Sequence, residues 1–423
     1  MGDLFCSDEN NKKKKNSKNY FAVKPKTISD INNIFFQNQS PFFQNLENYF
    51  PKEGEEFLKI YPNLQKLALN YKNIIPFQIP LLKQCQKTGC NKLTRRQAAV
   101  LFLLSFFKLI PSDPLNRFFV FNILMSKSRT QIQFGRCFLN YLIIIGKWLE
   151  NNDPILDEEI IFLRQNIDNK DYLENDNGGV DLCDVKIYER GSLFDSDAGY
   201  CVDFANKYIG GGVLRGGCVQ EEILFAIDPE AIVSLYFMEV MDNNDAIGIF
   251  NTIQYSKYRG YGSSFEFESS AILDPNDTTN IKRHRIIAID AVVNSYKFGL
   301  IDNNEHQKEI NRDIHKAYIG FNLINYETEK QTEKTIATGN WGCGVFGGNH
   351  ELKFIQQWIS ASYAGVKTLY YYTFEDKKMK NVINNLDNLK KKYKKAKELY
   401  EALLLNKIDG NNIINDLIAK NDN

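Results

Sequence analysis

The second half of the chain alternates short strand candidates with helical stretches, and this alternation constrains the fold more than any other feature of the sequence. The strand candidates are rich in β-branched and aromatic residues and are bounded by turn-forming residues. They cover residues 185–188, 200–204, 246–250, 286–292, 335–338 and 368–374. We therefore predict an α/β fold over residues 181–376, with a sheet covered by helices on both faces.

The region before it, residues 21–180, is predicted to be an all-helical accessory domain. Thr94 and Gln97 have the spacing of a capping box, in which each side chain accepts a backbone N–H at a helix start. Two apolar runs, residues 98–110 and 139–149, are shorter than the roughly 20 residues that cross a bilayer. We expect buried helices there and no membrane association. No alternating strand pattern is found, and a polar linker at residues 151–179 ends the region.

The two ends of the chain are rich in lysine. Residues 1–20 include four consecutive lysines and are predicted to form a disordered basic tail, either a solvated charge run or a nuclear-localisation signal. Residues 377–423 are predicted to be helical. Apolar residues recur there at spacings of three and four: Val382, Leu386, Leu389, Tyr393, Ala396, Tyr400 and Leu403. This seam suits a coiled-coil dimer or a helix packed on its own domain. Tyrosine and alanine in the seam favour the second, and we expect a monomer.

Charge and cysteine usage narrow the function classes. Lysine plus arginine total 52, as do aspartate plus glutamate, so no net field favours DNA, RNA or an anionic membrane. The eight cysteines and four histidines show no zinc-site spacing. We expect no sequence-specific nucleic-acid binding, no metal and no other cofactor. Reduced thiols fit the nucleus or the cytoplasm.

Three glycines (residues 210–212) follow the strand candidate at 200–204, and a Gln-Glu-Glu motif (residues 220–222) comes next. Glycines bring peptide N–H groups close to a ligand, and consecutive N–H groups form an anion-binding concavity that suits a diphosphate. Adjacent residues on a helix point about 100° apart, so one carboxylate can face a scissile bond while the other binds a hydroxyl. A plain turn followed by solvated glutamates would show the same residues.

A second glycine-rich segment, ATGNWGCGVFGG at residues 337–348, also follows a strand candidate and precedes a helix. Its backbone N–H groups could hold a second phosphate, or the segment could be a tight loop around a core tryptophan. Residues 254–262 carry three tyrosines. Such a cluster builds a core, or it stacks on a base and covers a sugar.

Together these segments resemble the poly(ADP-ribose) glycohydrolases. The resemblance rests on the three glycines, a seven-residue spacer and Gln-Glu-Glu, and on VDFAN, the GNWGCG-x-FGG loop, Y-x-x-Y-x-G-Y, AIDA and the Thr-Phe pair, all in the family's order. It covers about residues 180–376. The helical region is similar to the family's accessory domain in character and position.

The resemblance implies a macrodomain-like mixed sheet between helices, with ADP-ribose in a cleft at the strand ends. It implies a glycosidase of the DNA damage response that hydrolyses ribose–ribose (1″→2′) bonds of poly(ADP-ribose) on poly-ADP-ribosylated proteins. Glu222 matches the catalytic acid/base, and Glu221 matches the residue that binds the adjacent ribose. The other residues implied to bind substrate are Asp203, Phe204, Asn206, Gly210, Gly211, Gly212, Gln220, Tyr261, Asn340, Gly342, Gly344, Val345, Phe346 and Phe374.

One departure and two alternatives stand beside this interpretation. The family's Ile-Glu pair that contacts adenine has no counterpart at residues 191–195, so no adenine contact is assigned to Leu193 or Phe194. The chain could be a non-catalytic ADP-ribose-binding macrodomain, but the intact Gln-Glu-Glu motif argues against that. It could also be a hydrolase of ADP-ribose attached directly to protein. The aromatic loop and the helical region fit the polymer enzyme better.

Overall fold

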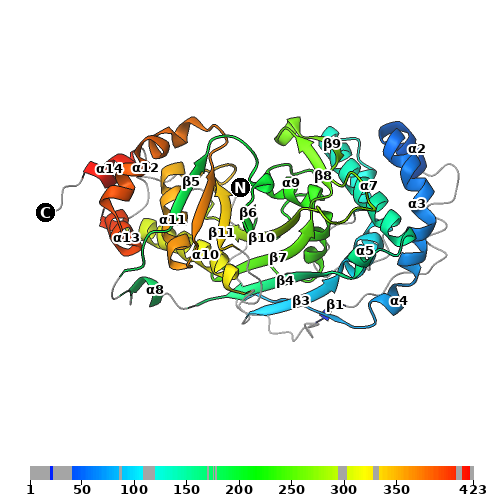
Figure 1. The fold of residues 1–423 in the computed structure, drawn as a ribbon, viewed down its shortest axis with the longest axis horizontal. Coiled ribbons are helices and arrows are strands. Elements are labelled where there is room, and N and C mark those ends of the chain that lie inside the picture. Colours follow the sequence, from blue (N-terminus) through cyan, green and yellow to red (C-terminus); the bar gives the residue numbers. More distant parts are fainter. Residues whose placement is uncertain are drawn as a thin grey trace, which may run out of the picture.

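The computed structural model of the chain describes residues 20–21, 41–84, 88–107, 120–168, 171–174, 176, 179–293, 303–326, 333–405 and 412–419. Its centre is a mixed eight-stranded sheet in the order β3-β4-β7-β10-β6-β11-β12-β5 (Figure 1). These strands are β3 (Gly89–Thr94), β4 (Glu159–Asn166), β5 (Asp184–Tyr188), β6 (Tyr200–Ala205), β7 (Asp245–Ile253), β10 (Arg283–Asp290), β11 (Thr335–Gly339) and β12 (Thr368–Tyr372). All six predicted strands are present, and the predicted mixed sheet is confirmed.

Parallel pairing runs through the half of the sheet that contains β10, β6, β11, β12 and β5. Strands β3, β4 and β7 complete the sheet by antiparallel pairing. Two small sheets lie outside it: β1 (Tyr20–Phe21) with β2 (Ile79–Pro80), and β8 (Ser256–Arg259) with β9 (Glu266–Ser270). Because parallel strands end at one edge, the residues that follow β10, β6, β11 and β12 are brought together there.

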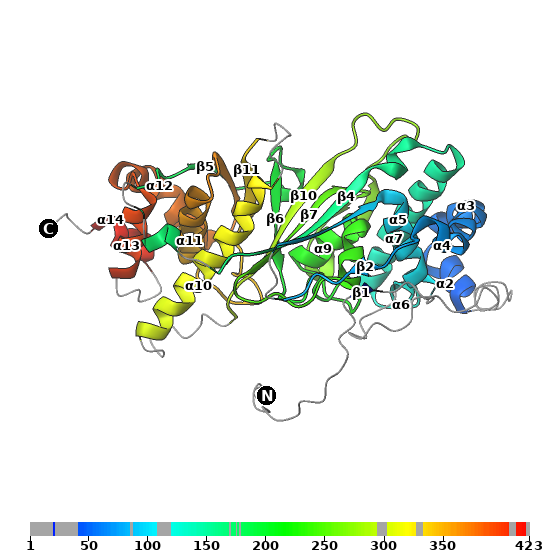
Figure 2. The ribbon, with the colours of Figure 1, turned by 90° about the horizontal axis from the view of Figure 1, so that it is seen from below.

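Helices cover both faces of the sheet (Figures 1 and 2). On one side lie α10 (Asn303–Asn322) and α11 (His350–Tyr363), and their apolar residues form one core with the sheet. On the other side lie α5 (Arg95–Phe106), α7 (Arg129–Glu150), α9 (Gln220–Ile227) and the 3-10 helix η3 (Pro229–Tyr236), around a second core. The predicted arrangement of a sheet between helices is therefore confirmed.

The predicted helical accessory region is confirmed, but the expectation that residues 21–180 contain no strands is wrong. Strands β3 and β4 come from this region and extend the central sheet by antiparallel pairing. Strand β4 also lies inside the predicted linker. It has a buried central run rather than alternating polar and apolar residues, because both of its faces are covered. A search for alternation therefore misses it.

Helices do form the rest of this region. They are α2 (Pro41–Tyr49), α3 (Pro51–Leu69), α4 (Tyr71–Ile74), α5, α6 (Phe121–Leu124), α7 and the short α8 (Asp171–Glu174). The predicted capping box begins α5: Thr94 accepts the N–H of Gln97, and the Gln97 side chain accepts the N–H of Thr94. Within the described residues, none of the helices combines the length and apolar character needed to span a bilayer. The apolar parts of α5 and α7 are buried, as predicted.

The C-terminal region folds onto its own domain. Its described residues form three α-helices, α12 (Lys380–Lys392), α13 (Ala396–Leu405) and α14 (Ile413–Ala419), rather than one continuous helix. The chain turns extended at Tyr393, which ends α12. Seam residues such as Val382, Leu389 and Leu403 are buried in the core that contains α10 and α11. Packing on its own domain is confirmed for this part of the chain. Residues 1–19 of the predicted basic tail lie outside the described residues, and Tyr20 begins β1.

Candidate active site

A cavity of about 660 Å³ opens at the carboxyl ends of β6, β10, β11 and β12. Ligands commonly bind at this edge of a sheet, and the volume suits a nucleotide-sized ligand. Most of the predicted site residues line it: Phe204, Asn206, Gln220, Glu221, Glu222, Tyr261, Asn340, Gly342, Gly344, Val345, Phe346 and Phe374. Four predicted substrate-binding residues do not line it: Asp203, Gly210, Gly211 and Gly212.

Gln220 begins α9 and completes the hydrogen bonding of β6. Strand β11 pairs only with the first part of β6, at Tyr200 and Cys201. Beyond that point the Gln220 side chain takes the place of a strand. Its Nε2 donates to the carbonyl of Val202 at 2.8 Å, and its Oε1 accepts the N–H of Phe204 at 2.7 Å. Since buried backbone groups need such partners, Gln220 fixes the start of α9 against the end of β6.

Glu221 is held by two backbone N–H groups of the loop that follows β6. Its Oε2 accepts the N–H of Asn206 at 2.8 Å, and its Oε1 accepts the N–H of Gly210 at 2.7 Å. The side chain is 2% exposed. Burial, followed by the neighbouring Asp203 carboxyl, raises the pKa of Glu221 well above its usual range. Glu221 therefore orders this loop while it faces the cavity.

Glu222 is held in the same way, by N–H groups on both sides. Its Oε1 accepts the N–H of Gly212 at 2.8 Å, and its Oε2 accepts the N–H of Val219 at 2.8 Å. The second bond is the return half of a capping box, because Val219 is the N-cap of α9 and Glu222 is the third helical residue. Backbone N–H groups thus hold both carboxyl oxygens of Glu222 at the first turn of α9. The acid at the cavity wall thus has one fixed orientation.

The first glycine loop (residues 210–212) binds the two glutamates, which corrects the predicted diphosphate role. Its first and third N–H groups donate to Glu221 and Glu222, and the N–H of Gly211 donates to the carbonyl of Tyr208 at 3.0 Å. None of the three N–H groups is left for a ligand. Position 211 favours glycine, because a Cβ there would lie 2.5 Å from a carboxylate oxygen of each glutamate.

Asp203 is fully buried in β6 and does not line the cavity. This position differs from the substrate-binding role that was predicted for it. Neither of its carboxyl oxygens has a hydrogen-bond partner among the described residues. Burial, and then the charge of Glu222, raises the pKa of Asp203 well above its usual range. Its raised pKa favours the protonated form of Asp203 next to the glutamate pair.

The burial of Asp203 predicts a pH-dependent effect of Asp203→Asn on stability. In the unfolded chain the carboxyl ionises near its ordinary pKa of about 3.9. In the folded chain the raised pKa keeps the proton on, so wild type loses stability as the pH rises between the two values. The asparagine variant lacks this loss. Relative to wild type, its free energy of unfolding in urea should increase from about pH 4.5 to about pH 8. An equal difference at both pH values would contradict a neutral Asp203.

The second glycine loop (residues 339–348) differs because several of its N–H groups are unused. The N–H groups of Gly342, Gly344, Val345 and Phe346 have no acceptor among the described residues. All four residues line the cavity, and a Cβ on Gly344 would meet nothing within 4 Å. This loop therefore has the anion-binding N–H groups that the first loop lacks.

Buried side chains hold the second loop in place. Trp341 is 1% exposed, and its Nε1 donates to the carbonyl of Ile289 on β10 at 2.9 Å. The Asn340 side chain donates to the carbonyl of Thr373 at 3.1 Å. The ammonium of Lys353 lies 4.5 Å from the centre of the Trp341 ring. The loop is thus a tight turn around a core tryptophan, and it also lines the cavity with open N–H groups. The sequence had left open either a phosphate-binding loop or a tight turn, and the loop has features of both.

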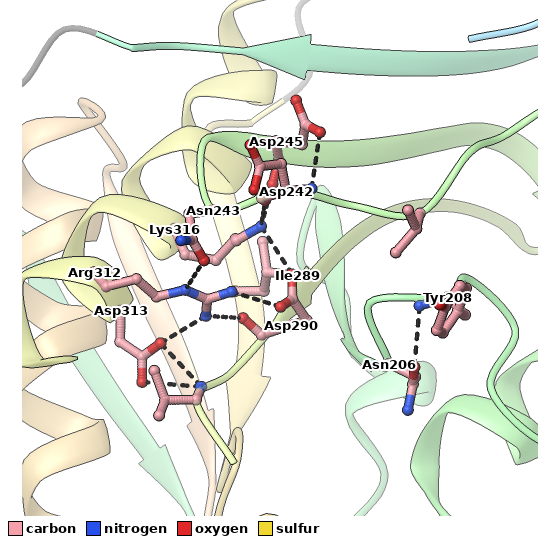
Figure 3. Close-up of polar contacts among 12 residues, drawn as sticks. Asn206, Tyr208, Asp242, Asn243, Asp245, Ile289, Asp290, Arg312, Asp313 and Lys316 are labelled. Atoms are coloured by element: carbon pink, nitrogen blue, oxygen red, sulfur yellow. Dashed lines mark hydrogen bonds and ion pairs between the residues drawn. The ribbon is translucent and has the colours of Figure 1, made fainter. Parts of the chain in front are cut away.

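A buried ion network lies behind the end of β10 (Figure 3). Arg312 of α10 lies between two carboxylates, at 2.5 Å from Asp290 and 2.8 Å from Asp313. Lys316 contacts the other oxygen of Asp290 at 2.8 Å. The network fixes the strand end that precedes Ala291, a cavity residue. Figure 3 also shows Asn206, which accepts the N–H of Tyr208 at 3.0 Å and turns its amide nitrogen away from that residue.

Aromatic side chains supply apolar walls. Tyr261 is 57% exposed and Phe374 is 46% exposed where they line the cavity. Phe374 has a φ of 55°, which is strained for a residue with a side chain and is typical of functional sites. The three tyrosines of residues 254–262 divide between the two roles considered: Tyr255 is fully buried in the core, while Tyr258 and Tyr261 line the cavity.

Several lining residues were not predicted: Ser192, Leu193, Phe194, Ala205, Val219, Ile223, Tyr258, Ala291, Trp341, Cys343, His350, Asp376 and Lys378. Leu193 and Phe194 reach the cavity although the family's Ile-Glu pair is absent. His350 follows the second glycine loop, and Asp376 and Lys378 follow the end of β12. The rule that ligands bind beyond the carboxyl ends of parallel strands would have pointed to these three.

Comparison with known proteins agrees with both parts of the fold. The family model of the poly(ADP-ribose) glycohydrolase helical domain matches residues 49–164, and the model of the poly(ADP-ribose) glycohydrolase macro domain fold matches residues 172–381. The helical-domain match includes β3 and most of β4, the strands that the sequence prediction missed.

This chain is also similar to three curated poly(ADP-ribose) glycohydrolases. Poly(ADP-ribose) glycohydrolase 1 of Arabidopsis thaliana is 29% identical, with 77% of this chain and 73% of that protein covered. Probable poly(ADP-ribose) glycohydrolase 2 of Arabidopsis thaliana is 30% identical, with coverages of 70% and 65%. Poly(ADP-ribose) glycohydrolase 1 of Caenorhabditis elegans is 31% identical, with coverages of 78% and 42%. The chain thus spans less than two thirds of the last two proteins. With both domain models matched in order, the chain belongs to the poly(ADP-ribose) glycohydrolases, a family of glycosidases.

Proposed function

We propose that this chain hydrolyses the ribose–ribose (1″→2′) O-glycosidic bonds of poly(ADP-ribose) and releases ADP-ribose, with Glu222 as general acid and then general base. One observation carries the proposal. A single cavity contains a carboxylate fixed by the N–H groups of Gly212 and Val219, and a second loop whose N–H groups have no partner among the described residues. These are the two parts that cleavage beside a diphosphate needs: a positioned acid and an anion site.

The proposed reaction proceeds in two balanced steps. Protonated Glu222 gives its proton to the departing 2′ oxygen, which also takes the electron pair of the C1″–O bond. The N–H groups of Gly212 and Val219 then stabilise the Glu222 carboxylate that remains. Water adds to C1″ and returns a proton to Glu222, which restores the acid. The diphosphate on the second loop offsets positive charge at C1″.

The neighbours of Glu222 have supporting roles in this proposal. Glu221 and Asn206 are proposed to bind the ribose next to the scissile bond, because both line the cavity beside Glu222. Tyr261 and Phe374 are proposed to enclose the substrate, since both expose aromatic surface along the cavity. Gln220 acts by fixing the start of α9, and its side chain also lines the cavity.

The steric fit around Glu222 gives a kinetic prediction. A Cβ at Gly217 would lie 2.8 Å from Oε1 of Glu222 and 2.9 Å from its carboxyl carbon. We expect Gly217→Ala to displace the carboxylate and lower kcat by about 10²-fold, because a misplacement of about 1 Å can cost that much. Steady-state kinetics on poly(ADP-ribose) measure this change, and ADP-ribose affinity should stay close to wild type. A kcat close to that of wild type would show that the carboxylate position is not critical.

Incubation of the purified chain with labelled poly(ADP-ribose) tests the proposal, with chromatography of the products. We expect ADP-ribose to accumulate as the polymer shortens. Polymer that binds the protein and stays intact would favour a non-catalytic ADP-ribose-binding macrodomain. Mono-ADP-ribosylated protein is the second substrate. Release of ADP-ribose from this protein at a rate equal to or above that of polymer cleavage would favour a hydrolase of protein-linked ADP-ribose.

A further inference from the structure

A histidine, an aspartate and a lysine line the cavity beside the second glycine loop, and the reaction proposed above uses none of them. His350 is the first residue of α11 and is 7% exposed. Asp376 is the N-cap of the 3-10 helix η7 (Lys377–Met379), which follows β12, and Lys378 lies in that helix and is exposed. The other charged residues that line the cavity are Glu221 and Glu222. Lys378 is therefore the one permanent cation among the described lining residues.

The contacts of His350 fix which ring nitrogen is left for a ligand. Its Nε2 lies 3.0 Å from Oδ2 of Asp376, a contact that requires the imidazole to donate. The other oxygen of Asp376 accepts the N–H of Lys378 at 2.9 Å, so this carboxylate is held in place. Nδ1 of His350 has no partner among the described residues. With the proton on Nε2, Nδ1 is free to take up a second proton and donate to an anion.

We propose that His350 and Lys378 are charged ligands of the ADP-ribose diphosphate, beside the N–H groups of Gly344 and Phe346, and that the diphosphate binds with uptake of a proton at Nδ1 of His350. This inference rests on the proposed function and names further residues of that same site. The second loop and these two side chains line one cavity, whereas the N–H groups of the first loop are already bound to carboxylates. A diphosphate carries about two negative charges, and charged donors bind phosphate oxygens more strongly than neutral ones.

The electrostatic surroundings of His350 agree with proton uptake on binding. The pKa of His350 lies below its ordinary value. Burial is the main cause; Asp376 raises the pKa and Lys378 lowers it. The thiol of Cys343, from the second loop, is neutral because burial raises its pKa to about 12. Glu351, the next residue on α11, accepts bonds from Asn381 and Ile414 instead. His350 is thus neutral in the free protein at neutral pH, and a bound dianion would favour its protonated form.

Calorimetric titration of ADP-ribose into the full chain tests the inference. In wild type, affinity should rise as the pH falls from about 8 to about 6, because protonated His350 binds the ligand better. Titration in two buffers of different ionisation enthalpy should reveal net proton uptake near neutral pH. His350→Gln should remove both the pH dependence and the uptake. Lys378→Ala should weaken binding by about 10-fold at low salt, less at high salt, since it removes a charge-assisted contact.

Lys377→Ala is the matched control, because Lys377 is the exposed neighbour of Lys378 and does not line the cavity. It should bind ADP-ribose as wild type does. Adenosine, which has no phosphate, should bind all variants equally. A wild type that takes up no proton, together with an unchanged affinity in Lys378→Ala, would overturn the inference and leave the proposed function intact. A wild type that does not bind ADP-ribose would overturn the proposed function itself.

Discussion

Glu222→Gln is expected to lower the rate of poly(ADP-ribose) hydrolysis by about 10²- to 10⁴-fold, the usual contribution of a general acid or base. The amide cannot give and take back the proton that the departing oxygen and the attacking water require. It can still accept one of the two N–H bonds that hold the carboxylate, from Gly212 or Val219. The site should therefore keep its shape, and ADP-ribose should bind within a few-fold of wild type.

Product release measured by chromatography gives the rate, and calorimetry gives the affinity for ADP-ribose. Glu47→Gln on the exposed side of α2 makes the same chemical change far from the cavity lining and should leave both quantities unchanged. If Glu222→Gln hydrolyses the polymer within about 10-fold of the wild-type rate, the role of Glu222 is refuted. A general acid contributes at least about 10²-fold to the rate. Loss of ADP-ribose binding would instead show that the substitution disrupts the site.

Arg95→Leu is expected to give the largest loss of stability, about 3–5 kcal/mol in the free energy of unfolding. Arg95 begins α5 and is fully buried, where its guanidinium pairs with Glu230 of η3. Glu230 is also fully buried and accepts the Tyr255 hydroxyl at 2.7 Å. Leucine in place of the arginine leaves the Glu230 carboxylate buried without its cation, and that uncompensated charge causes the loss.

Urea denaturation of three variants separates the buried charge from loss of packing. The double variant Arg95→Leu/Glu230→Gln removes both charges and should recover much of the lost stability. Lys59→Ala removes one partner of an exposed pair with Glu55 on α3 and should change stability by less than about 1 kcal/mol. If the double variant is as unstable as Arg95→Leu, or if Arg95→Leu costs no more than Lys59→Ala, the ion pair is not what joins these elements.

The elements that the sequence predicted well were those with a local signal. Strands such as β6 and β11 combine β-branched or aromatic residues with clear turn residues at their ends. The α5 capping box is a local pattern and was predicted residue by residue. Strand β3, GCNKLT, has little apolar character, and β4 is buried on both faces. These two strands form because the sheet and helices around them bury or pair them, which no local pattern records.

In the site, the sequence also did not reveal which backbone N–H groups are already bound within the protein. Both glycine loops follow a strand and precede a helix, so the sequence suggested phosphate binding for each of them. They differ because Glu221 and Glu222, on the first turn of α9, reach back to the loop before them. The helix that follows the second loop begins with His350 and Glu351, and neither side chain occupies that loop's N–H groups. The sequence gives no clue to this contact, because the side chain of Val219 has no acceptor and the usual capping-box pattern is absent.

The central claim is that the two loops divide the work, the first fixing the acid and the second binding the diphosphate. A crystal structure of Glu222→Gln with ADP-ribose tests it most directly. We predict diphosphate oxygens within hydrogen-bonding distance of the N–H groups of Gly344 to Phe346, and the anomeric carbon of the distal ribose next to position 222. A diphosphate seated on residues 210–212, or a distal ribose turned away from position 222, would contradict it.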